Sequence, residues 1–517
     1  MKIIKSIYKN KLAAILMMVA FGCTSCDDWF TIYPESETVL EDFWQDQNDV
    51  TSMVAACYRA MLEPAFMERV IVWGEVRSDN VLKGSGSNDN VNRFLDLQLT
   101  ASNPYTQWGE FYKVINYCNT VIHYAPQVHE KDPNYTEAQL LNHIAEVKTI
   151  RALCYFILVR TFRDIPFIID PSIDDTKSYS VAQENPKKVL EYLINDLKQV
   201  KAQDAFQNQY YDKGRVTQKA VWALIADMAL WMNDYETCIE YCTKAENVPG
   251  LELDLSQNFN SNVFIRANSK ESVFELQFSN TLPNYVATEM YSHNTSLGRT
   301  SDDRVLSSYD FSKTSPLLFS TTDMRGKDFY RPRDDNGLYP IIKYMGYRTR
   351  YDSDESSVYI YSSCQKWIFY RLSDVYLMKA EALTERGGGN DLEEAFNYVC
   401  RTYNRANPDR TVSLLYADYA SQTAMRQLVF DERQREFVFE GKRYYDLIRK
   451  IEREENLTSI VGTYLVSRKY VHLDQSTIRS KLNDINALYM PIHTDELKAN
   501  SLLVQNPFYD ISSVAKN

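Results

Sequence analysis

The chain has 517 residues, a formal net charge of −12 at pH 7 and 44% hydrophobic residues. This length exceeds what one small hydrophobic core organises, so we expect a large domain or two closely packed lobes. The negative charge argues against nucleic acid as a partner, because phosphates need a basic surface. Beyond the first residues no segment approaches eighteen consecutive apolar residues, so no transmembrane helix is predicted.

The start of the chain has the pattern of an export signal that ends at a lipid-accepting cysteine. Four lysines precede an apolar run, 12–22, which is too short to span a bilayer and has the length of a signal-peptide core. The small residues Thr24 and Ser25 then precede Cys26, as a bacterial lipoprotein signal peptidase requires. We therefore expect removal of residues 1–25 and attachment of acyl chains, including palmitate, to Cys26.

Two alternatives concern the same segment. An ordinary signal peptide would be cleaved without lipid attachment. Acylation of Cys23 is disfavoured because the bulky Phe21 lies two positions before it. The pair Cys23 and Cys26 is not a redox motif, because processing separates the two residues.

The composition indicates neither a metal site nor a disulfide framework. Six histidines are scattered without the spacing of metal ligands, so we expect no metal and no cofactor. Six of the internal cysteines fall in apolar helical patterns, where a free thiol behaves as a small buried hydrophobe. They are Cys57, Cys118, Cys154, Cys238, Cys242 and Cys400. The unusual feature is 37 tyrosines, a residue type that is enriched at binding surfaces.

Most of the chain has the 3.6-residue periodicity of helices. Single helices are predicted over 49–62, 106–124, 137–162 and 186–203. Two helix hairpins follow, one over 219–248 and one formed by 369–386 and 392–404, with small residues at the spacings of a tetratricopeptide repeat. Two such hairpins beside other long helices favour a mostly α-helical, helix-pair scaffold.

Two polar segments interrupt this pattern. Residues 251–362 are rich in Ser, Asn, Gly and Tyr and lack helical periodicity, apart from one predicted strand over 272–278. Residues 83–103 form a second, shorter polar loop. Binding residues tend to lie on loops that a rigid frame supports, so these two segments are the candidates for ligand contact. Residues 451–517 are mixed, with a last short helix over 494–499.

Catalytic patterns are missing from the sequence. It contains no nucleophile elbow, P-loop, HExxH zinc motif or dinucleotide fingerprint. Acidic pairs such as Asp302 and Asp303 are typical of solvated turns, so we predict no enzymatic activity. The charged segment 431–450 reads as one helix, with ion pairs between Glu440 and Arg443 and between Asp446 and Lys450.

Several segments together resemble the SusD/RagB-like outer-membrane lipoproteins of Bacteroidetes nutrient-uptake systems. The segment from Cys26, CDDWFTIYPES, is similar to that family's opening. The other similar segments are WGEVRSDNV (73–81), WGEFYKVINYCNTVI (108–122), AEVKTIRALCYFILVRTFRDIPFI (145–168), YRLSDVYLMKAEAL (370–383), DERQREFVFEGKRYYDLIRK (431–450), LYMPIH (488–493) and QNPFY (505–509). They occur in the family's order along the whole chain. One departure is Arg163, where glycine is commoner.

The resemblance implies a fold of about four tetratricopeptide-like helix pairs with an irregular, loop-rich ligand-binding lobe. The expected organisation is a signal peptide (1–25), then one SusD/RagB-like domain (26–517). Within that domain we expect a helical scaffold (about 45–250 and 363–450), an insertion lobe (about 251–362) and a mixed C-terminal segment (451–517).

The resemblance also implies a function without catalysis. Such proteins are anchored by lipid in the outer membrane, face the exterior, capture oligosaccharide and deliver it to a SusC-like TonB-dependent transporter. The family's ligand residues lie mostly outside the shared motifs, so we select candidates by chemistry: amides and a guanidinium for hydroxyl groups, and aromatic rings for stacking. The candidates are Asn88, Asn90 and Arg93 in the first loop and Tyr285, Tyr291 and Tyr347 in the second.

Three other functions remain open. The same architecture could capture peptides or protein fragments, since the family includes such members. A tetratricopeptide adaptor in envelope assembly would not need the long tyrosine-rich segment 251–362, which counts against it. A glycoside hydrolase would require turnover that depends on particular carboxylates.

Overall fold

The computed structural model describes residues 43–84, 86–173, 180–204, 209–284, 286–291, 304–307, 319–320, 322–329, 339, 341–344, 364–409 and 412–510. The chain divides into two compact units, Met1–Gln45 and Asp46–Asn517, and the following concerns the second. Cys26 and the predicted signal peptide lie outside the described residues.

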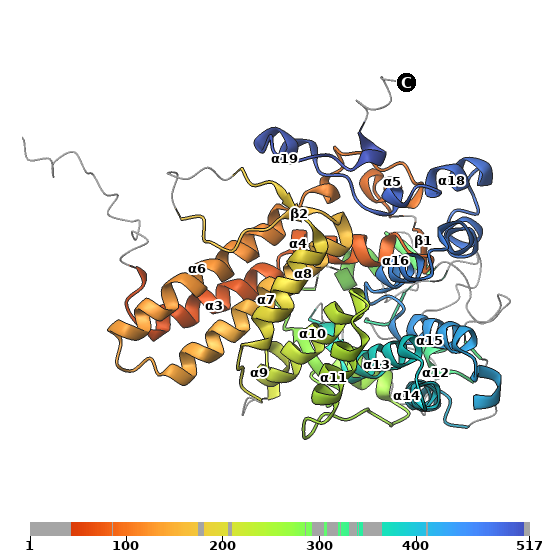
Figure 1. Cartoon of the computed structure of the whole chain (residues 1–517), viewed down its shortest axis with the longest axis horizontal. Helices are drawn as coiled ribbons and strands as arrows, with labels where there is room; N and C mark the ends of the chain where they lie inside the picture. Colours follow the sequence, from red (N-terminus) through yellow and green to blue (C-terminus); the bar gives the residue numbers. More distant parts are fainter. Residues whose placement is uncertain are drawn as a thin grey trace, which may run out of the picture. The chain divides into compact units, whose positions relative to one another are not determined.

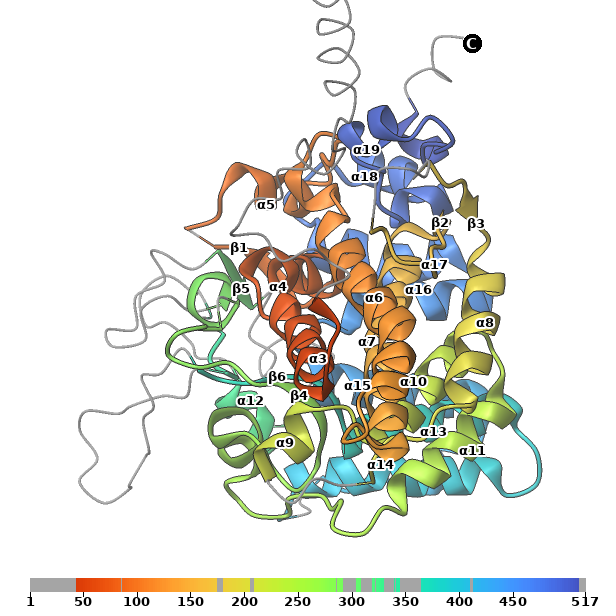
Figure 2. The ribbon, with the colours of Figure 1, turned by 90° about the vertical axis from the view of Figure 1, so that its left-hand side faces the viewer.

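The N-terminal part of this unit is a layer of long helices. Helices α3 (Gln47–Met61), α6 (Gly109–Lys131) and α7 (Glu137–Phe162) lie side by side (Figures 1 and 2). A capping box starts α7, in which Thr136 and Gln139 satisfy each other's backbone N–H groups. Helix α7 is exposed in its first turn and buried on nearly every side in its second half, where the sequence is mostly apolar. The shorter helices α4 (Pro64–Ile71) and α8 (Pro186–Lys198) flank this layer.

Antiparallel helix pairs continue the scaffold. Helices α10 (Gln218–Trp231) and α11 (Tyr235–Glu246) form one pair, and α13 (Leu372–Arg386) and α14 (Asp391–Ala406) form the next. Helices α15 (Gln422–Phe437) and α16 (Arg443–Glu454) follow. Both hairpins predicted from the sequence are therefore present, and the fold class is confirmed as mostly α-helical with tetratricopeptide-like pairing.

Backbone geometry explains two of the helix ends. Gly387 has a φ of +65° and ends α13 in the left-handed conformation that glycine adopts without steric cost. Arg163, which follows α7, also has a positive φ of 72°. The resemblance gave glycine as the commoner residue at this position, and the positive φ is the physical reason for that preference.

Three small antiparallel sheets join distant parts of the chain. Strand β1 (Val81–Lys83) pairs with β5 (Val305–Ser307), and β4 (Ser272–Leu276) pairs with β6 (Trp367–Arg371). Strand β2 (Ile165–Pro166) pairs with β3 (Gln183–Glu184). The predicted strand at 272–278 is thus present, but the start of the predicted helix 369–386 belongs to β6.

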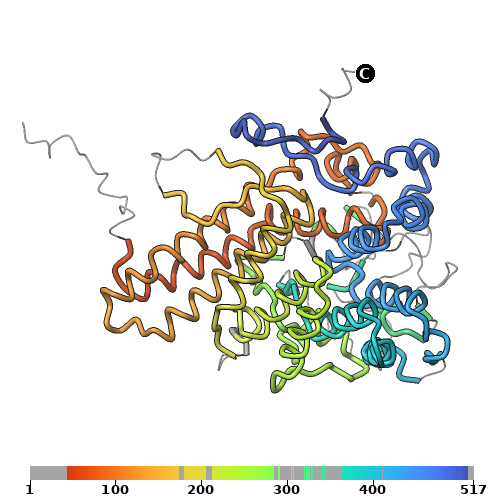
Figure 3. Tube along the Cα trace, in the orientation of Figure 1, coloured from red at the N-terminus to blue at the C-terminus, as the bar shows by residue number. Residues whose placement is uncertain are grey.

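The remaining elements are short. They are η2 (Val72–Val76), α5 (Asp89–Leu95), η3 (Pro104–Thr106), α9 (Gln209–Gly214), η4 (Ser261–Arg266), η5 (Val286–Tyr291), α12 (Met324–Asp328) and η6 (Tyr416–Tyr419). In the C-terminal segment they are α17 (Leu457–Ile460), η7 (Val461–Lys469), α18 (Gln475–Leu482), η8 (Ile485–Leu488), α19 (Thr494–Ala499) and η9 (Pro507–Tyr509). The C-terminal segment runs back beside α5 at one end of the trace (Figure 3).

The prediction of one continuous helix over 431–450 is wrong. The helix ends at Phe437 and restarts at Arg443, because Phe439 and Gly441 adopt positive φ values of 68° and 73°. The two predicted ion pairs are not formed. Glu440 and Arg443 bind other residues, and so do Asp446 and Lys450.

Several expectations about composition can be compared with the structure. Five of the six cysteines predicted to be buried are buried free thiols, whereas Cys400 is only half-buried. None of the helices in the described residues has the length and apolar character that a membrane span requires. In the same residues, no three side chains of the metal-binding types converge on one point.

Candidate functional site

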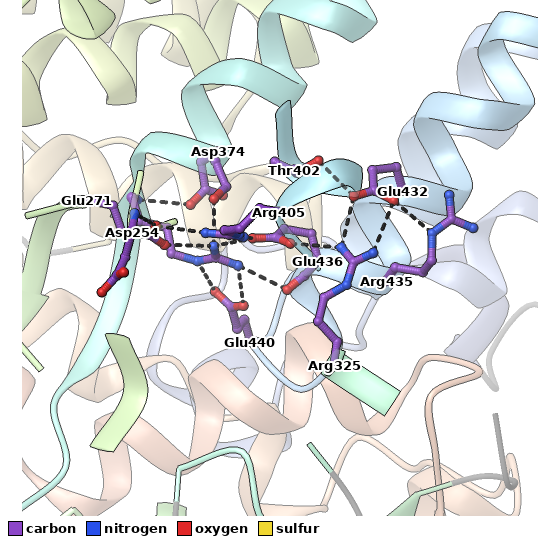
Figure 4. Close-up of polar contacts among 12 residues, drawn as sticks. Asp254, Glu271, Arg325, Asp374, Thr402, Arg405, Glu432, Arg435, Glu436 and Glu440 are labelled. Atoms are coloured by element: carbon purple, nitrogen blue, oxygen red, sulfur yellow. Dashed lines mark hydrogen bonds and ion pairs between the residues drawn. The ribbon is translucent and has the colours of Figure 1, made fainter. Parts of the chain in front are cut away.

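Charged side chains gather in the interior of the unit, where the scaffold meets residues 251–362 (Figure 4). We call this cluster the charged hub and define it by eight side chains, each no more than 1% exposed. They are Glu271, Arg325, Lys343, Arg371, Arg405, Glu432, Glu436 and Glu440. Four cations thus bind four carboxylates, and the equally buried Asp323 lies 2.7 Å from Arg325 at the edge of the hub.

Bridging contacts hold the hub together. The Arg371 guanidinium lies 2.8 Å from Glu440 and also contacts Glu436 and Glu271. Arg325 lies 2.9 Å from both Glu432 and Glu436. Each carboxylate therefore serves more than one element, and removal of any cation would leave a buried negative charge exposed to the low-dielectric interior.

The pKa values of the hub follow from this pairing. Burial alone raises the pKa of Glu440, but Arg371 and Lys343 outweigh it and lower the pKa to about 2. Burial lowers the pKa of Lys343 to about 8, although Glu440 lies 2.6 Å from its ammonium group. At Glu436, too, burial is outweighed by nearby arginines, which lower its pKa well below the usual value, so Glu436 and Glu440 are ionised. All four hub carboxylates bind protein groups, an arrangement that suits cohesion of the fold.

The break between α15 and α16 is locked by the segment 73–81. The Glu75 carboxylate accepts hydrogen bonds from the backbone N–H groups of Phe439 and Gly441, at 3.1 and 2.9 Å. Burial raises the pKa of Glu75 to about 7, against the effect of these bonds. A side chain at Gly74 would overlap the Gly441 carbonyl, so the two backbones can approach closely only because residue 74 is glycine.

The motifs that carry the resemblance thus converge inside the molecule. Segments 73–81, 370–383 and 431–450 supply Glu75, Arg371 and Glu440, all buried. Arg371 and Glu440 bind each other, and Glu75 accepts from Asn80 and two backbone N–H groups, so none of the three side chains is available to a ligand. A ligand site has to be sought at the surface.

The two polar loops of the sequence meet at one surface. Antiparallel pairing places Val81 opposite Ser307 and Lys83 opposite Val305, so the segment that leads into α5 lies beside the insertion. We call the resulting surface the α5 face. It comprises Glu68, Asn88, Asn90, Arg93, Tyr105, Glu289 and Arg304, which come from α4, α5 and its cap, η3, η5 and the residue before β5.

Arg304 organises the middle of this face. Its guanidinium lies 2.5 Å from Glu68 and 2.8 Å from Glu289, so it ties the insertion to α4. The Tyr105 hydroxyl donates to the same Glu68 carboxylate at 3.2 Å. Burial and then this carboxylate raise the pKa of Tyr105 to about 12, so the hydroxyl remains a donor at physiological pH.

The three candidates of the first loop lie together on α5. Asn88 is exposed and caps the helix, because its side-chain oxygen accepts from the N–H of Val91 at 2.9 Å. Arg93 is exposed in the last turn, and Asn90 is half-buried. Within the described residues, the side chains of Asn90 and Arg93 make no hydrogen bond or ion pair, so their polar groups face solvent.

The candidates of the second loop are placed differently. Tyr291 is 1% exposed, and its hydroxyl donates to the Phe439 carbonyl at 3.0 Å, so its ring packs inside the molecule. Tyr285 and Tyr347 lie outside the described residues. None of the described residues of the α5 face is an aromatic ring open to solvent, since Tyr105 is 6% exposed.

Sequence reasoning missed Glu68, Tyr105, Glu289 and Arg304. Each has an unremarkable neighbourhood in the sequence, and Glu68 lies in a helix outside both polar loops. The fold brings these side chains together, because Arg69 of α4 donates to the Pro104 and Gln107 carbonyls and β1 pairs with β5. No spacing along the chain indicates either contact.

Family models match both halves of the chain. The model described as "SusD family" matches residues 325–509, and the one described as "Starch-binding associating with outer membrane" matches residues 33–230. The chain belongs to the SusD/RagB-like family.

Similar proteins and solved structures agree with this assignment. A SusD-like protein of Formosa agariphila is 24% identical over 487 residues, which cover 84% of this chain and 89% of that protein. A SusD homologue of Bacteroides thetaiotaomicron has the same fold, with a TM-score of 0.70 at 20% identity over 90% of this chain and all of the other. Surface glycan-binding protein A of the same organism, solved in complex with laminarihexaose, has a TM-score of 0.68 at 19% identity, over 89% of this chain and 100% of its own.

Proposed function

We propose that this chain is a surface lipoprotein that binds an oligosaccharide at the α5 face and passes it, uncleaved, to a SusC-like TonB-dependent transporter. Family membership of both halves of the chain supports this function. The observation that carries the location of the site is the β1–β5 pairing, which brings the two polar loops to one surface. The proposed organisation is the one expected above, with Cys26 as the lipid anchor on the exterior face of the outer membrane.

The chemistry of the α5 face suits a hydroxyl-rich ligand. Asparagine amides both donate and accept hydrogen bonds, and the Arg93 guanidinium offers paired donors that fit vicinal hydroxyl groups. Arg304 is already neutralised by Glu68 and Glu289, which favours a neutral sugar over an anionic one. Tyr285 and Tyr347 remain the proposed stacking residues.

Binding is tested by a glycan array followed by calorimetry on the purified chain. We expect affinity for an oligosaccharide, and Arg93→Ala should weaken it about tenfold, or about 1.4 kcal/mol, the size of one charged hydrogen bond. Arg59→Ala is the matched control, because Arg59 is an exposed arginine of α3 outside the α5 face. If the chain binds peptides but none of the glycans tested, the ligand is a peptide or protein fragment and not an oligosaccharide.

Retention of the bound sugar tests the absence of catalysis. After long incubation with the chain, chromatography should recover the oligosaccharide at its original length. Shorter products that vanish when a named carboxylate is replaced would establish a hydrolase.

The anchor and the partner are tested in cells. Cys26→Ala should move the chain from the membrane fraction to the soluble one, because acyl chains supply the attachment. Persistent membrane attachment of this variant would reject Cys26 as the anchor. Affinity purification of the lipidated chain should recover a TonB-dependent transporter as a stoichiometric partner.

A further inference from the structure

Two residues of the C-terminal segment, for which the sequence analysis predicted no role, contact the backbone at the end of α5. The Tyr470 hydroxyl donates to the Phe94 carbonyl at 3.4 Å, and the Lys481 ammonium donates to the Leu97 carbonyl at 3.4 Å. These contacts fall at the end of α5 and just beyond it. The position of α5 therefore depends on residues that are distant from it in the sequence.

Lys469, the last residue of η7, makes the deepest of these contacts. Its ammonium group donates to the backbone carbonyls of Val76 and Val81, at 2.6 and 2.8 Å, and the residue is 1% exposed. The two carbonyls are the two ends of the turn that leads from η2 into β1. Among the described residues, no carboxylate lies within ion-pairing distance of this ammonium group.

A buried ammonium without a carboxylate partner is costly, and its environment reflects that cost. Burial lowers the pKa of Lys469 to about 7, and the more distant carboxylates of Asp79, Glu75 and Asp96 oppose this only in part. Lys469 therefore contributes through two directed hydrogen bonds to backbone, and not through an ion pair.

The side chains of the same turn are held independently. Arg443 lies 2.8 Å from the Asp79 carboxylate, and Asn80 contacts both Glu75 and Gln434, at 2.7 and 2.8 Å. These contacts fix the middle of the turn. The bond between Asn80 and Glu75 also spans the turn, but within the part of the chain that the structure describes Lys469 is the side chain that binds the carbonyls at both ends, and the second carbonyl belongs to the first residue of β1.

We propose that Lys469 is a positioning residue for the α5 face. By holding both ends of the turn 76–81 it sets the direction of β1, and hence where β1 meets β5 and where α5 presents Asn88 and Arg93. This inference rests on the proposed function only in treating the α5 face as a ligand-binding surface. The placement of β1 and α5 can be tested without any ligand.

The test is amide hydrogen exchange of the full chain, measured by mass spectrometry. Lys469→Met keeps the aliphatic stem but removes the donors, and should raise exchange in 77–95 at least tenfold while 137–162 changes less than twofold. Lys469→Arg, which can donate to both carbonyls, should restore the protection. Lys219→Met is the matched control, because Lys219 is a similarly buried lysine on α10 that should leave 77–95 unchanged.

Unchanged exchange in 77–95, or an equal rise throughout the chain, would overturn the proposal, whatever the chain binds. If Lys469→Met does not fold, Lys469→Gln is used, because its shorter side chain should still lose the contact with at least one carbonyl and loosen the same segment. Where an oligosaccharide has been found, Lys469→Met should also weaken its binding at least threefold. If Lys469→Met loses binding without faster exchange in 77–95, Lys469 is not a positioning residue. If exchange in 77–95 rises but the native chain binds no oligosaccharide, only the proposed function is rejected.

Discussion

The charged hub and the α5 face use the same side-chain types for opposite purposes. In the hub, carboxylates and guanidinium groups are buried and bind one another, so every charge has a partner. On the α5 face, Arg304 is paired but Asn90 and Arg93 face solvent. Four of the eight hub residues, Arg371, Glu432, Glu436 and Glu440, lie in segments that resemble the family, whereas all seven residues of the α5 face lie outside those segments. The charged residues of the motifs in the hub therefore contribute to the fold by binding other protein groups.

The largest expected effect is loss of a hub cation. Arg371→Met leaves Glu436, Glu440 and Glu271 with an uncompensated buried charge, and should lower the free energy of unfolding by about 3–5 kcal/mol. Arg59→Met, at an exposed pair with Glu63, should change it by less than about 0.5 kcal/mol. Chemical denaturation measures both. Equal effects of the two variants would erase the distinction between hub and surface.

Acid should weaken the hub. The pKa of Glu440 is about 2 in the folded chain and near 4.5 when unfolded. Its stabilising contribution is therefore complete above pH 4.5 and is lost as the pH falls toward 2, by up to about 3 kcal/mol. Denaturation at pH 3 and pH 6 should show this loss in the native chain and a smaller one in Glu440→Gln. The same slope in both proteins would show that Glu440 is not responsible.

A smaller loss of stability is expected where the backbone at Gly74 packs against the backbone at Gly441. Gly74→Ala introduces a methyl group that overlaps the Gly441 carbonyl, and should cost about 2 kcal/mol of stability. Gly109→Ala is the control, because nothing lies within 4 Å of the added atom at the start of α6. A neutral Gly74→Ala would mean that the break between α15 and α16 can shift away from η2.

The smallest effect on stability belongs to the face. Arg93→Ala removes an exposed side chain without a partner in the described residues, so the midpoint of thermal unfolding should stay within about 1 °C. A clear drop in this midpoint would assign Arg93 to the fold and remove it from the candidate site.

Prediction from the sequence succeeded where the apolar periodicity of a single segment determines its helix. Helix α7 and the short helix α19 have the expected bounds, and both helix hairpins are present. Periodicity therefore indicates most scaffold helices, but not the break between α15 and α16.

Prediction failed where long-range partners override local spacing. Glu440 and Asp446 were expected to pair with Arg443 and Lys450, but Glu440 binds Arg371, and Asp446 binds Arg433 at 2.8 Å. Lys450 pairs with Glu454 instead. The helix between them breaks because Glu75, far away in sequence, accepts the N–H groups of Phe439 and Gly441.

The candidate site was only partly predictable for the same reason. Asn88, Asn90 and Arg93 lie together because one short helix carries them. Tyr291 was selected by residue type, and its burial against Phe439 depends on contacts that composition does not reveal. Arg304 and Glu68 come together only through the fold.

The pairing of β1 with β5 has a consequence for the order of folding. Residue 81 meets residue 307, so the contact closes a very long loop, and the entropy of that closure must be offset before the strands gain anything. Helix pairs close short loops and form early, whereas contacts of this separation form late. During synthesis the α5 face therefore stays incomplete until the chain has grown past β5. The α5 face is therefore among the last parts of the protein to mature.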